Sequence, residues 1–277
     1  MMVDRFAVSE RRACRVAGQH RSTQRRPDPA AGRGDDELRD RLRAISREYP
    51  RWGYRTAWGH LRQQGVRVNR KRVQRLWREE GLKRPAKRRK RRRVGQSTGQ
   101  VHRATGPGNI WAIDFQFDVT TDGRQIKLLH VIDEYTRQAH AIHLARSIDA
   151  DQLVTILDQL AHQHGTPGNV RMDNGPEMTA ATVRDWCRFN RSTTNYIEPG
   201  SPWQNPFVES FGSRVRDEVL AVQVFDTLAE AKVVLEDWRV EYNTVRPHSS
   251  LNWMTPEQFN LACRRGLTNK EQQHQLS

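Results

Sequence analysis

The spacing of hydrophobic residues changes near position 109 and divides the chain into two kinds of sequence. Before this point, between residues 35 and 82, apolar residues recur every three or four positions, as at Leu38, Leu42 and Ile45, which is the spacing of one helix face. Breaks rich in glycine and proline separate three such helices, and Asn69, a favoured N-cap residue, begins the third. Three short helices joined by tight turns predict a helix-turn-helix domain over residues 35–82.

The second kind of sequence alternates between strands and helices. Three successive strands are predicted at residues 110–120, 126–133 and 139–145, and two more at 169–172 and 193–197. Helices are predicted at residues 149–164, 179–190, 206–219 and 228–243. This order predicts an α/β fold with a mixed sheet and helices on both faces, preceded by the all-α helix-turn-helix domain.

The remaining segments are predicted to be short modules and connections. Residues 1–34 predict a helical remnant and a linker, with two short helices between residues 8 and 26. Residues 83–108 predict a basic linker, because nine of the eleven residues from 83 to 93 are Lys or Arg and repel one another. The α/β domain is predicted at residues 109–262 and a C-terminal tail at 263–277.

The chain has a formal net charge of +15, and its charged residues are distributed unevenly along the sequence. Residues 1–103 hold 31 Lys and Arg against 10 Asp and Glu, whereas residues 104–277 hold 16 against 22. The basic part is therefore expected to bind a polyanion, which is most naturally nucleic acid, while the acidic part concentrates carboxylates for another purpose. Four basic residues of the third predicted helix are candidate DNA contacts: Arg70, Lys71, Arg72 and Arg75.

Cysteine content and hydropathy exclude other classes of protein. Cys14, Cys187 and Cys263 lie far apart, so neither a disulfide framework nor a zinc knuckle is indicated, and a reducing cytoplasm is expected. The longest uninterrupted apolar runs have four residues, far below the roughly 20 that span a bilayer. The arginine-rich start lacks the apolar segment of a signal peptide, and no membrane role is predicted.

Three acidic residues lie on predicted elements that can bring their carboxylates close together. Asp114 lies in the middle of a predicted strand, where burial of an unpaired carboxylate is costly, so a positive group is expected to face it. Asp173 follows a strand, the place where α/β sheets form ligand sites, and Glu209 lies on a helix. Carboxylates from these three elements can converge on two divalent ions, an arrangement suited to phosphoryl transfer, and magnesium is the expected metal.

The motifs around these residues are specific. They are Ile-Asp-Phe at Asp114, Asp-Asn-Gly-Pro-Glu from Asp173, and Pro-Trp-Gln-Asn-x-x-Val-Glu-Ser-Phe around Glu209, and 35 residues separate Asp173 from Glu209. With these motifs the chain resembles the integrase catalytic core of the OrfB-type insertion-sequence transposases. The likeness continues through residues 242–251 and 255–259 and reaches back through residues 49–81, so it covers about 250 residues.

This resemblance implies a ribonuclease H-like fold and an enzyme that cleaves DNA and transfers the freed 3′ hydroxyl. Asp114, Asp173 and Glu209 are then the catalytic metal ligands for two Mg²⁺ ions, with Mn²⁺ as an alternative. Arg216 falls where relatives carry a basic residue that contacts DNA. Three further residues are predicted to contact the DNA backbone or to support the metal ligands: Asn174, Gln204 and Asn205.

The resemblance also implies partners and shows two departures. The expected partners are double-stranded DNA, as element ends and target, a second copy of the chain on that DNA, and the product of an upstream reading frame as a fusion partner. The expected location is the bacterial cytoplasm, at the nucleoid. Pro206 and Gly212 replace the Gly and Asn usual in relatives. Proline is tolerated in a first helical turn, and Gly212 costs roughly 1 kcal/mol of helix propensity.

The sequence supports three alternative functions less well. A catalytically inactive DNA-binding repressor of transposition would use the same helix-turn-helix domain, but the intact carboxylates argue against it. A nuclease of the same fold acting on RNA in hybrids is disfavoured because a helix-turn-helix suits duplex DNA. A tyrosine recombinase would need a nucleophilic tyrosine among several arginines, and the sequence around Arg246 and His248 does not provide that set.

Overall fold

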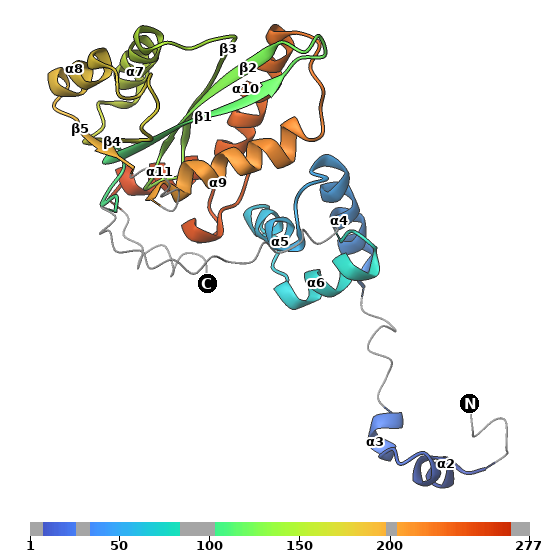
Figure 1. Cartoon of the computed structure of the whole chain (residues 1–277). Coiled ribbons are helices and arrows are strands. Elements are labelled where there is room, and N and C mark those ends of the chain that lie inside the picture. The colour runs from blue at the N-terminus through green and yellow to red at the C-terminus, as the bar shows by residue number, and fades with distance from the viewer. Residues whose placement is uncertain (1–7, 26–33, 84–102, 198–203, 267–277) are drawn as a thin grey trace. The chain divides into compact units, whose positions relative to one another are not determined.

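A computed structural model describes residues 8–25, 34–83, 103–197 and 204–266 (Figure 1). The chain divides into two compact units, Met1–Glu48 and Tyr49–Ser277. This division falls within the range predicted for the helix-turn-helix domain, and the domain limits given above remain predictions. The predicted basic run at residues 84–93 and the tail beyond residue 266 lie outside the described residues.

Among the described residues of the first unit there are three helices, α2 (Glu10–Val16), α3 (Arg21–Gln24) and α4 (Asp36–Glu48). Ser9 caps α2, since its side chain accepts a hydrogen bond from the Arg12 amide at 3.4 Å. The helix α4 buries Leu38, Leu42 and Ile45, the face that the hydrophobic spacing predicted. The helices expected in this part of the chain are therefore confirmed.

The second unit begins with α5 (Tyr54–Gln63) and α6 (Arg70–Glu79), which pack against each other. The Asn69 side chain accepts a hydrogen bond from the Lys71 amide at 2.8 Å, so it is the predicted N-cap of α6. The buried face of α6 is formed by Val73, Leu76 and Trp77. Of the basic residues of this helix, Arg70, Lys71 and Arg78 are exposed, whereas Arg72 and Arg75 are half-buried.

A five-stranded mixed sheet follows, in the order β3-β2-β1-β4-β5. Its strands are β1 (Ile110–Val119), β2 (Gln125–Asp133), β3 (Ala139–Ala145), β4 (Asn169–Met172) and β5 (Thr193–Tyr196). β1, β2 and β3 are antiparallel neighbours, whereas β4 lies parallel to both β1 and β5. β1 is thus hydrogen-bonded on both sides, and the mixed sheet predicted from the sequence is confirmed.

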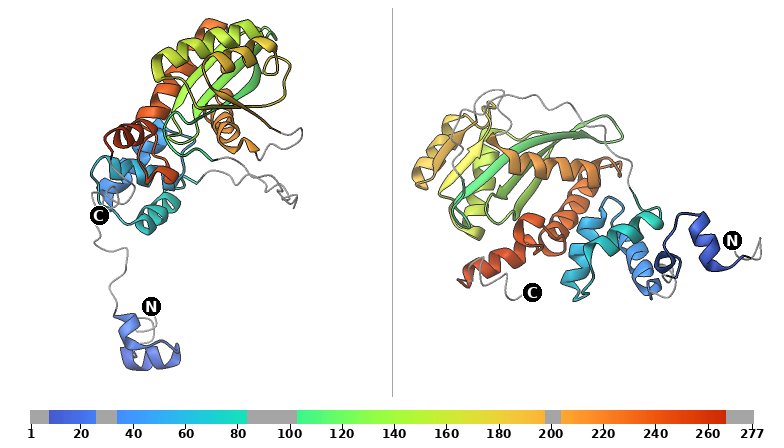
Figure 2. Two further views of the ribbon diagram at one scale, coloured as in Figure 1. Left: turned by 90° about the vertical axis from the view of Figure 1, so that its left-hand side faces the viewer. Right: turned by 90° about the horizontal axis from the view of Figure 1, so that it is seen from below.

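Helices cover both faces of the sheet (Figure 1 and Figure 2). One hydrophobic core places α7 (Ala150–His164) and α8 (Ala181–Phe189) against the face that carries Trp111 and Ile113. The other places α9 (Pro206–Val215) and α10 (Leu228–Thr244) against the face that carries Ala112 and Leu128. A 3-10 turn, η3 (Ser249–Leu251), and α11 (Pro256–Arg264) complete the described fold.

The helix predicted at residues 206–219 changes its hydrogen bonding near its end. After Val215 it continues as a π-helical turn, η2 (Arg216–Leu220), which closes wider hydrogen-bonded rings than an α-helix. Such turns within helices frequently occur at functional sites. The change begins at Arg216, one of the predicted DNA contacts.

None of the helices within the described ranges is both long enough and apolar enough to cross a membrane.

Phe211 is the centre of the aromatic packing that holds α9 on the sheet. Its side chain is 1% exposed, and its ring lies 5.2 Å from His130, 4.9 Å from Tyr242 and 5.6 Å from Trp238, measured between ring centroids. The contacts with His130 and Tyr242 are edge-to-face, and such contacts add to the stabilisation that comes from burial. α9 is therefore tied both to β2 and to α10.

We predict that Phe211→Ala lowers the free energy of unfolding by about 3 to 5 kcal/mol, because it removes buried apolar surface and leaves a cavity. Phe189→Ala is the matched control, since Phe189 is 86% exposed and its loss should change stability by less than about 0.5 kcal/mol. Denaturant unfolding of the full chain measures both. Equal effects of the two substitutions would contradict the packing described for α9.

Candidate active site

Asp114 lies in the middle of β1, the central strand, and is half-buried. The pKa of this carboxyl is raised from 3.8 to about 7, mainly by burial and to a smaller extent by the charges of Asp173 and Glu209, while a backbone hydrogen bond from Phe115 lowers it. The residue directly across on β2 is His130. Burial lowers the pKa of His130 to about 3, so its ring is neutral and is not the positive group expected to face Asp114.

Asp173 follows the last residue of β4 and is exposed at the edge of the sheet. Its Oδ1 accepts a hydrogen bond from the Gly175 amide at 3.1 Å, which begins a tight turn. The amides of Met178 and Thr179 both donate to the Gly175 carbonyl and close that turn. A Cβ at position 175 would lie 3.1 Å from the Asp173 carboxylate, so glycine allows the backbone to approach the carboxylate closely.

Glu209 lies in the first turn of α9, and its side chain is exposed. Neighbouring protein atoms nevertheless desolvate the carboxyl in part, and this raises the pKa of Glu209. Pro206 occupies the first turn of the helix, where the missing amide hydrogen bond costs nothing, as predicted. The Asn205 Nδ2 atom donates to the Ile113 carbonyl at 3.2 Å, which fixes the start of α9 beside the strand residue that precedes Asp114.

The three carboxylates come from a strand, the end of another strand and a helix, and Asp173 and Glu209 both act electrostatically on Asp114. In the part of the chain that the structure describes, no three His, Cys, Asp or Glu side chains are grouped closely enough, as they stand, to hold a metal ion. The donor set consists only of carboxylate oxygens, which are the ligands that magnesium prefers. The chemistry of these residues therefore fits a hard divalent cation.

Arg216 and Gln116 lie next to this group. When the Gln116 amide is oriented to satisfy its neighbours, its oxygen accepts from Arg216 Nη2 at 3.3 Å, and its nitrogen donates to His130 Nε2 at 2.7 Å and to the Gly212 carbonyl at 3.3 Å. A Cβ at position 212 would lie 3.3 Å from Gln116 Oε1 and 3.7 Å from His130 Cδ2. Glycine at this position allows α9 to pack closely against β1 and β2.

The three amide side chains predicted near the site have different positions. Asn174 is exposed, and its Nδ2 donates to the Ile197 carbonyl at 2.7 Å, which links the ends of β4 and β5. Gln204 is half-buried just before α9. Asn205 is 3% exposed and its Oδ1 has no hydrogen-bond partner among the described residues, so of its two predicted roles burial favours support of the site over contact with DNA.

The four predicted DNA contacts of α6 have unequal exposure. Arg70 and Lys71 are exposed, whereas Arg72 and Arg75 are half-buried. Arg75 forms an ion pair with Glu79 one turn later, at 2.8 Å. Arg70 and Lys71 are therefore the residues of this set best placed to meet a phosphate.

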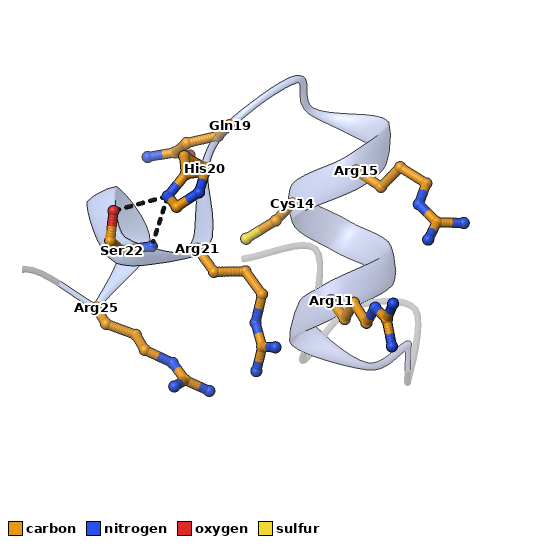
Figure 3. Close-up of a pocket in the computed structure, with 8 residues that line it drawn as sticks. All are labelled: Arg11, Cys14, Arg15, Gln19, His20, Arg21, Ser22 and Arg25. Carbon is orange, nitrogen blue, oxygen red and sulfur yellow. Dashed lines mark hydrogen bonds between the residues drawn. The ribbon is translucent and has the colours of Figure 1, made fainter.

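A hollow of about 680 Å³ lies between α2 and α3 (Figure 3). It is lined by Arg11, Cys14, Arg15, Gln19, His20, Arg21, Ser22 and Arg25. Glu10 forms an ion pair with Arg25 at 2.9 Å and lies 3.7 Å from Arg21, so part of the positive charge is neutralised. The hollow contains none of the three candidate carboxylates.

Two buried ion pairs beside the site were not predicted from the sequence. Arg171, two residues before Asp173, lies 2.5 Å from Glu134, and both side chains are buried. Lys127 lies 2.5 Å from Glu177 of the Asp-Asn-Gly-Pro-Glu motif. Sequence pattern gives no signal for either pair, because their partners are 37 and 50 residues apart.

Comparisons with known proteins place the chain in a family. Models described as "Integrase core domain" match residues 104–202 and 190–256, and one described as "HTH-like domain" matches residues 33–91. The chain is 38% identical over 256 residues to a 31.7 kDa protein of insertion element IS407 from Burkholderia multivorans, which covers 92% of each chain. The chain belongs to the integrase-core family of insertion-element transposases.

Two further proteins of this transposase family are similar in sequence to the chain. A 39.2 kDa protein of insertion element IS476 from Xanthomonas euvesicatoria is 38% identical over 93% of this chain and 74% of its own length. The transposase of insertion sequence element IS904 from Lactococcus lactis is 27% identical over 80% of this chain and 92% of its own length. The family predicted from the motifs is thus confirmed.

Among solved structures, the catalytic core domain of HTLV-2 integrase in complex with magnesium is similar, with a sequence identity of 14% and a TM-score of 0.46. The matched region spans 57% of this chain and 99% of the integrase chain. The catalytic core domain of BIV integrase is 18% identical, with the same TM-score and coverage of 57% and 97%. The sheet order and the two helical layers of this transposase are those of the predicted ribonuclease H-like fold.

We predict that Asp114→Asn raises the melting temperature of metal-free protein at pH 8. The folded-state pKa of Asp114 is raised, so ionisation destabilises the fold. This penalty is fully present above about pH 7 and fades as pH falls towards 4. After allowance for partial exposure, removal of the charge should add on the order of 2 kcal/mol, or roughly 4 to 8 °C.

Thermal unfolding in chelator at pH 8 and pH 5 measures this difference. Asp118→Asn on the same strand is the matched control and should leave the melting temperature nearly unchanged. A gain for Asp114→Asn that is equally large at pH 5 would show that ionisation of Asp114 is not its cause.

Proposed function

We propose that this transposase catalyses metal-dependent cleavage of DNA strands and transfer of the freed 3′ hydroxyl to a target, with Asp114, Asp173 and Glu209 as the residues that hold the metal ions. The observation that carries this proposal is the electrostatic effect of Asp173 and Glu209 on Asp114, although the three residues come from different elements. A carboxyl whose pKa is raised by burial and by neighbouring charges is a frequent mark of a functional site.

Each of the three residues has a position suited to this role. Asp114 is fixed by the hydrogen bonds of β1 to both neighbouring strands. Asp173 is oriented by the Gly175 turn, and Glu209 by the attachment of Asn205 to β1. Two Mg²⁺ ions, or Mn²⁺ in their place, would stabilise the charge on the attacking and leaving oxygens of the phosphoryl group.

The remaining candidate residues are proposed to hold DNA. Arg216 lies at the π-helical turn that continues α9, and Asn174 and Gln204 lie close in sequence to Asp173 and Glu209. On α6, Arg70, Lys71, Arg72 and Arg75 are proposed to bind the phosphates of the element ends. Because two DNA ends must be brought together, we further propose that the protein acts as a homo-oligomer on duplex DNA at the bacterial nucleoid.

We predict that purified protein cuts labelled element ends with Mg²⁺ and not with chelator, and that Glu209→Gln reduces the cleavage rate by at least about a thousandfold, since a carboxylate ligand is lost. Glu257→Gln is the matched control, because Glu257 also lies in the first turn of a helix that begins with proline. The control should cut at nearly the wild-type rate.

Binding of element ends without cutting under any divalent metal would instead favour the repressor function. In a last version of the cleavage assay, the product of an upstream reading frame is added to the protein. If cutting appears only in this version, the fusion partner predicted from the sequence is required.

We predict that Arg70→Ala combined with Lys71→Ala weakens duplex binding and lowers the salt dependence of the affinity. Each phosphate contact contributes about 0.9 to the slope of log affinity against log salt, so the slope should fall by about 2. Arg188→Ala removes a comparably exposed arginine, on α8, and should change neither quantity. Fluorescence anisotropy across a salt series gives both values, and an unchanged slope in the double variant would exclude α6 as the phosphate-binding helix.

A further inference from the structure

Lys127 is a buried cation on β2, where its neighbours in the sheet are Phe117 and Ala145. Its side chain is only 9% exposed. The Nζ atom donates to Glu177 Oε1 at 2.5 Å and to the Ile148 carbonyl at 3.1 Å. A buried lysine carries a large desolvation cost, which these two oxygen acceptors offset.

Glu177 belongs to the turn that carries Asp173. The Gly175 amide donates to Asp173 Oδ1, and a Cβ on Gly175 would lie 3.1 Å from that oxygen and 3.7 Å from Glu177 Oε2. Both carboxylates therefore lie close to Gly175 in one compact turn. Met178, the next residue, is completely buried and fixes the far side of the turn in the core below α7 and α8.

The same lysine also contacts the residue that follows Asp114. Its Nζ atom lies 4.0 Å from the centroid of the Phe115 ring, within the range of a cation-π interaction. Phe115 packs against the core that also contains Met178. Lys127 thus contacts one immediate neighbour of Asp114 and the far end of the turn that begins at Asp173.

We propose that the ion pair between Lys127 and Glu177 positions Asp173 relative to Asp114 and thereby sets the affinity of the site for divalent cations. The two residues act through the ligands and do not bind the metal themselves. This inference rests on the proposed function of the three carboxylates.

Glu177 could otherwise be mistaken for a fourth metal ligand, since it lies in the Asp-Asn-Gly-Pro-Glu motif. Its Oε1 is bound by Lys127, whose hydrogen bond is the main cause of a lowered pKa for Glu177. Removal of either partner leaves the other without an opposite charge, and for Lys127 this charge is buried. The turn then loses its only described ion pair, while the hydrogen bond from Gly175 to Asp173 remains.

Binding of Mn²⁺ to the full chain tests this inference through metal affinity, measured by calorimetry, without relying on cleavage. We expect Lys127→Met and Glu177→Ala each to weaken Mn²⁺ binding about tenfold or more, as is typical when a residue that orients metal ligands is removed. Combination of the two should weaken binding no further than Lys127→Met alone, because both changes break the same pair.

Glu218→Ala is the matched control. Glu218 forms a comparably buried ion pair with Arg246 at 2.7 Å, which joins η2 to the segment after α10. Its loss should lower the melting temperature while leaving Mn²⁺ affinity within about twofold of wild type. If Lys127→Met does not fold, Glu177→Ala still tests the inference, since its side chain is 30% exposed.

The outcomes distinguish the two proposals. Wild-type protein that binds no Mn²⁺ and cuts no DNA would overturn the proposed function. Wild-type protein that binds and cuts, with Mn²⁺ affinity unchanged in both Lys127→Met and Glu177→Ala, would overturn the positioning role alone. A loss of affinity in Glu218→Ala as large as in Glu177→Ala would also overturn it, because the effect would then follow from lowered stability.

Discussion

The burial of the Asp114 carboxyl on the central strand, in the field of the Asp173 and Glu209 charges, is the constraint on which the rest of the core depends. Burial disfavours the charged form of a carboxyl and nearby negative charges disfavour it further, so such a group must be held by the fold around it. The fold holds it at its most constrained strand: β1 is hydrogen-bonded on both sides and covered on both faces. Stability built elsewhere in the sheet is what allows this unfavourable arrangement.

Polar contacts hold the two elements that position Glu209 and Asp173, which are α9 and the end of β4. Asn205 ties the start of α9 to the backbone of β1, and Gln116 joins β1 to both His130 and α9. Arg171 and Glu134 connect β4 to the turn after β2. Hydrophobic packing alone brings these elements together, whereas directional bonds fix their angles and therefore the directions of the carboxylates.

Hydrophobic spacing predicted the five strands and the helices around them because each element buries one continuous face, as α4 does with Leu38, Leu42 and Ile45. The motifs also indicated Asp114, Asp173 and Glu209, whose separation in the chain is distinctive. Long-range pairings could not be predicted: Lys127 looks like a solvent-exposed strand residue until the turn at Glu177 is seen beside it. The π-helical turn at Arg216 was also missed, since one wider turn hardly alters the hydrophobic spacing.

The close packing at Gly212 restricts which residues can be exchanged at this position and at its neighbours in related sequences. The space that a side chain would occupy there is filled by Gln116 from β1 and His130 from β2. A larger residue at position 212 therefore requires a smaller or differently oriented residue at 116 or 130. Mutational drift at these three positions should be correlated across related sequences, although they are separated by up to 96 residues along the chain. Relatives with asparagine at 212 are expected to carry the compensating exchange on one of the two strands.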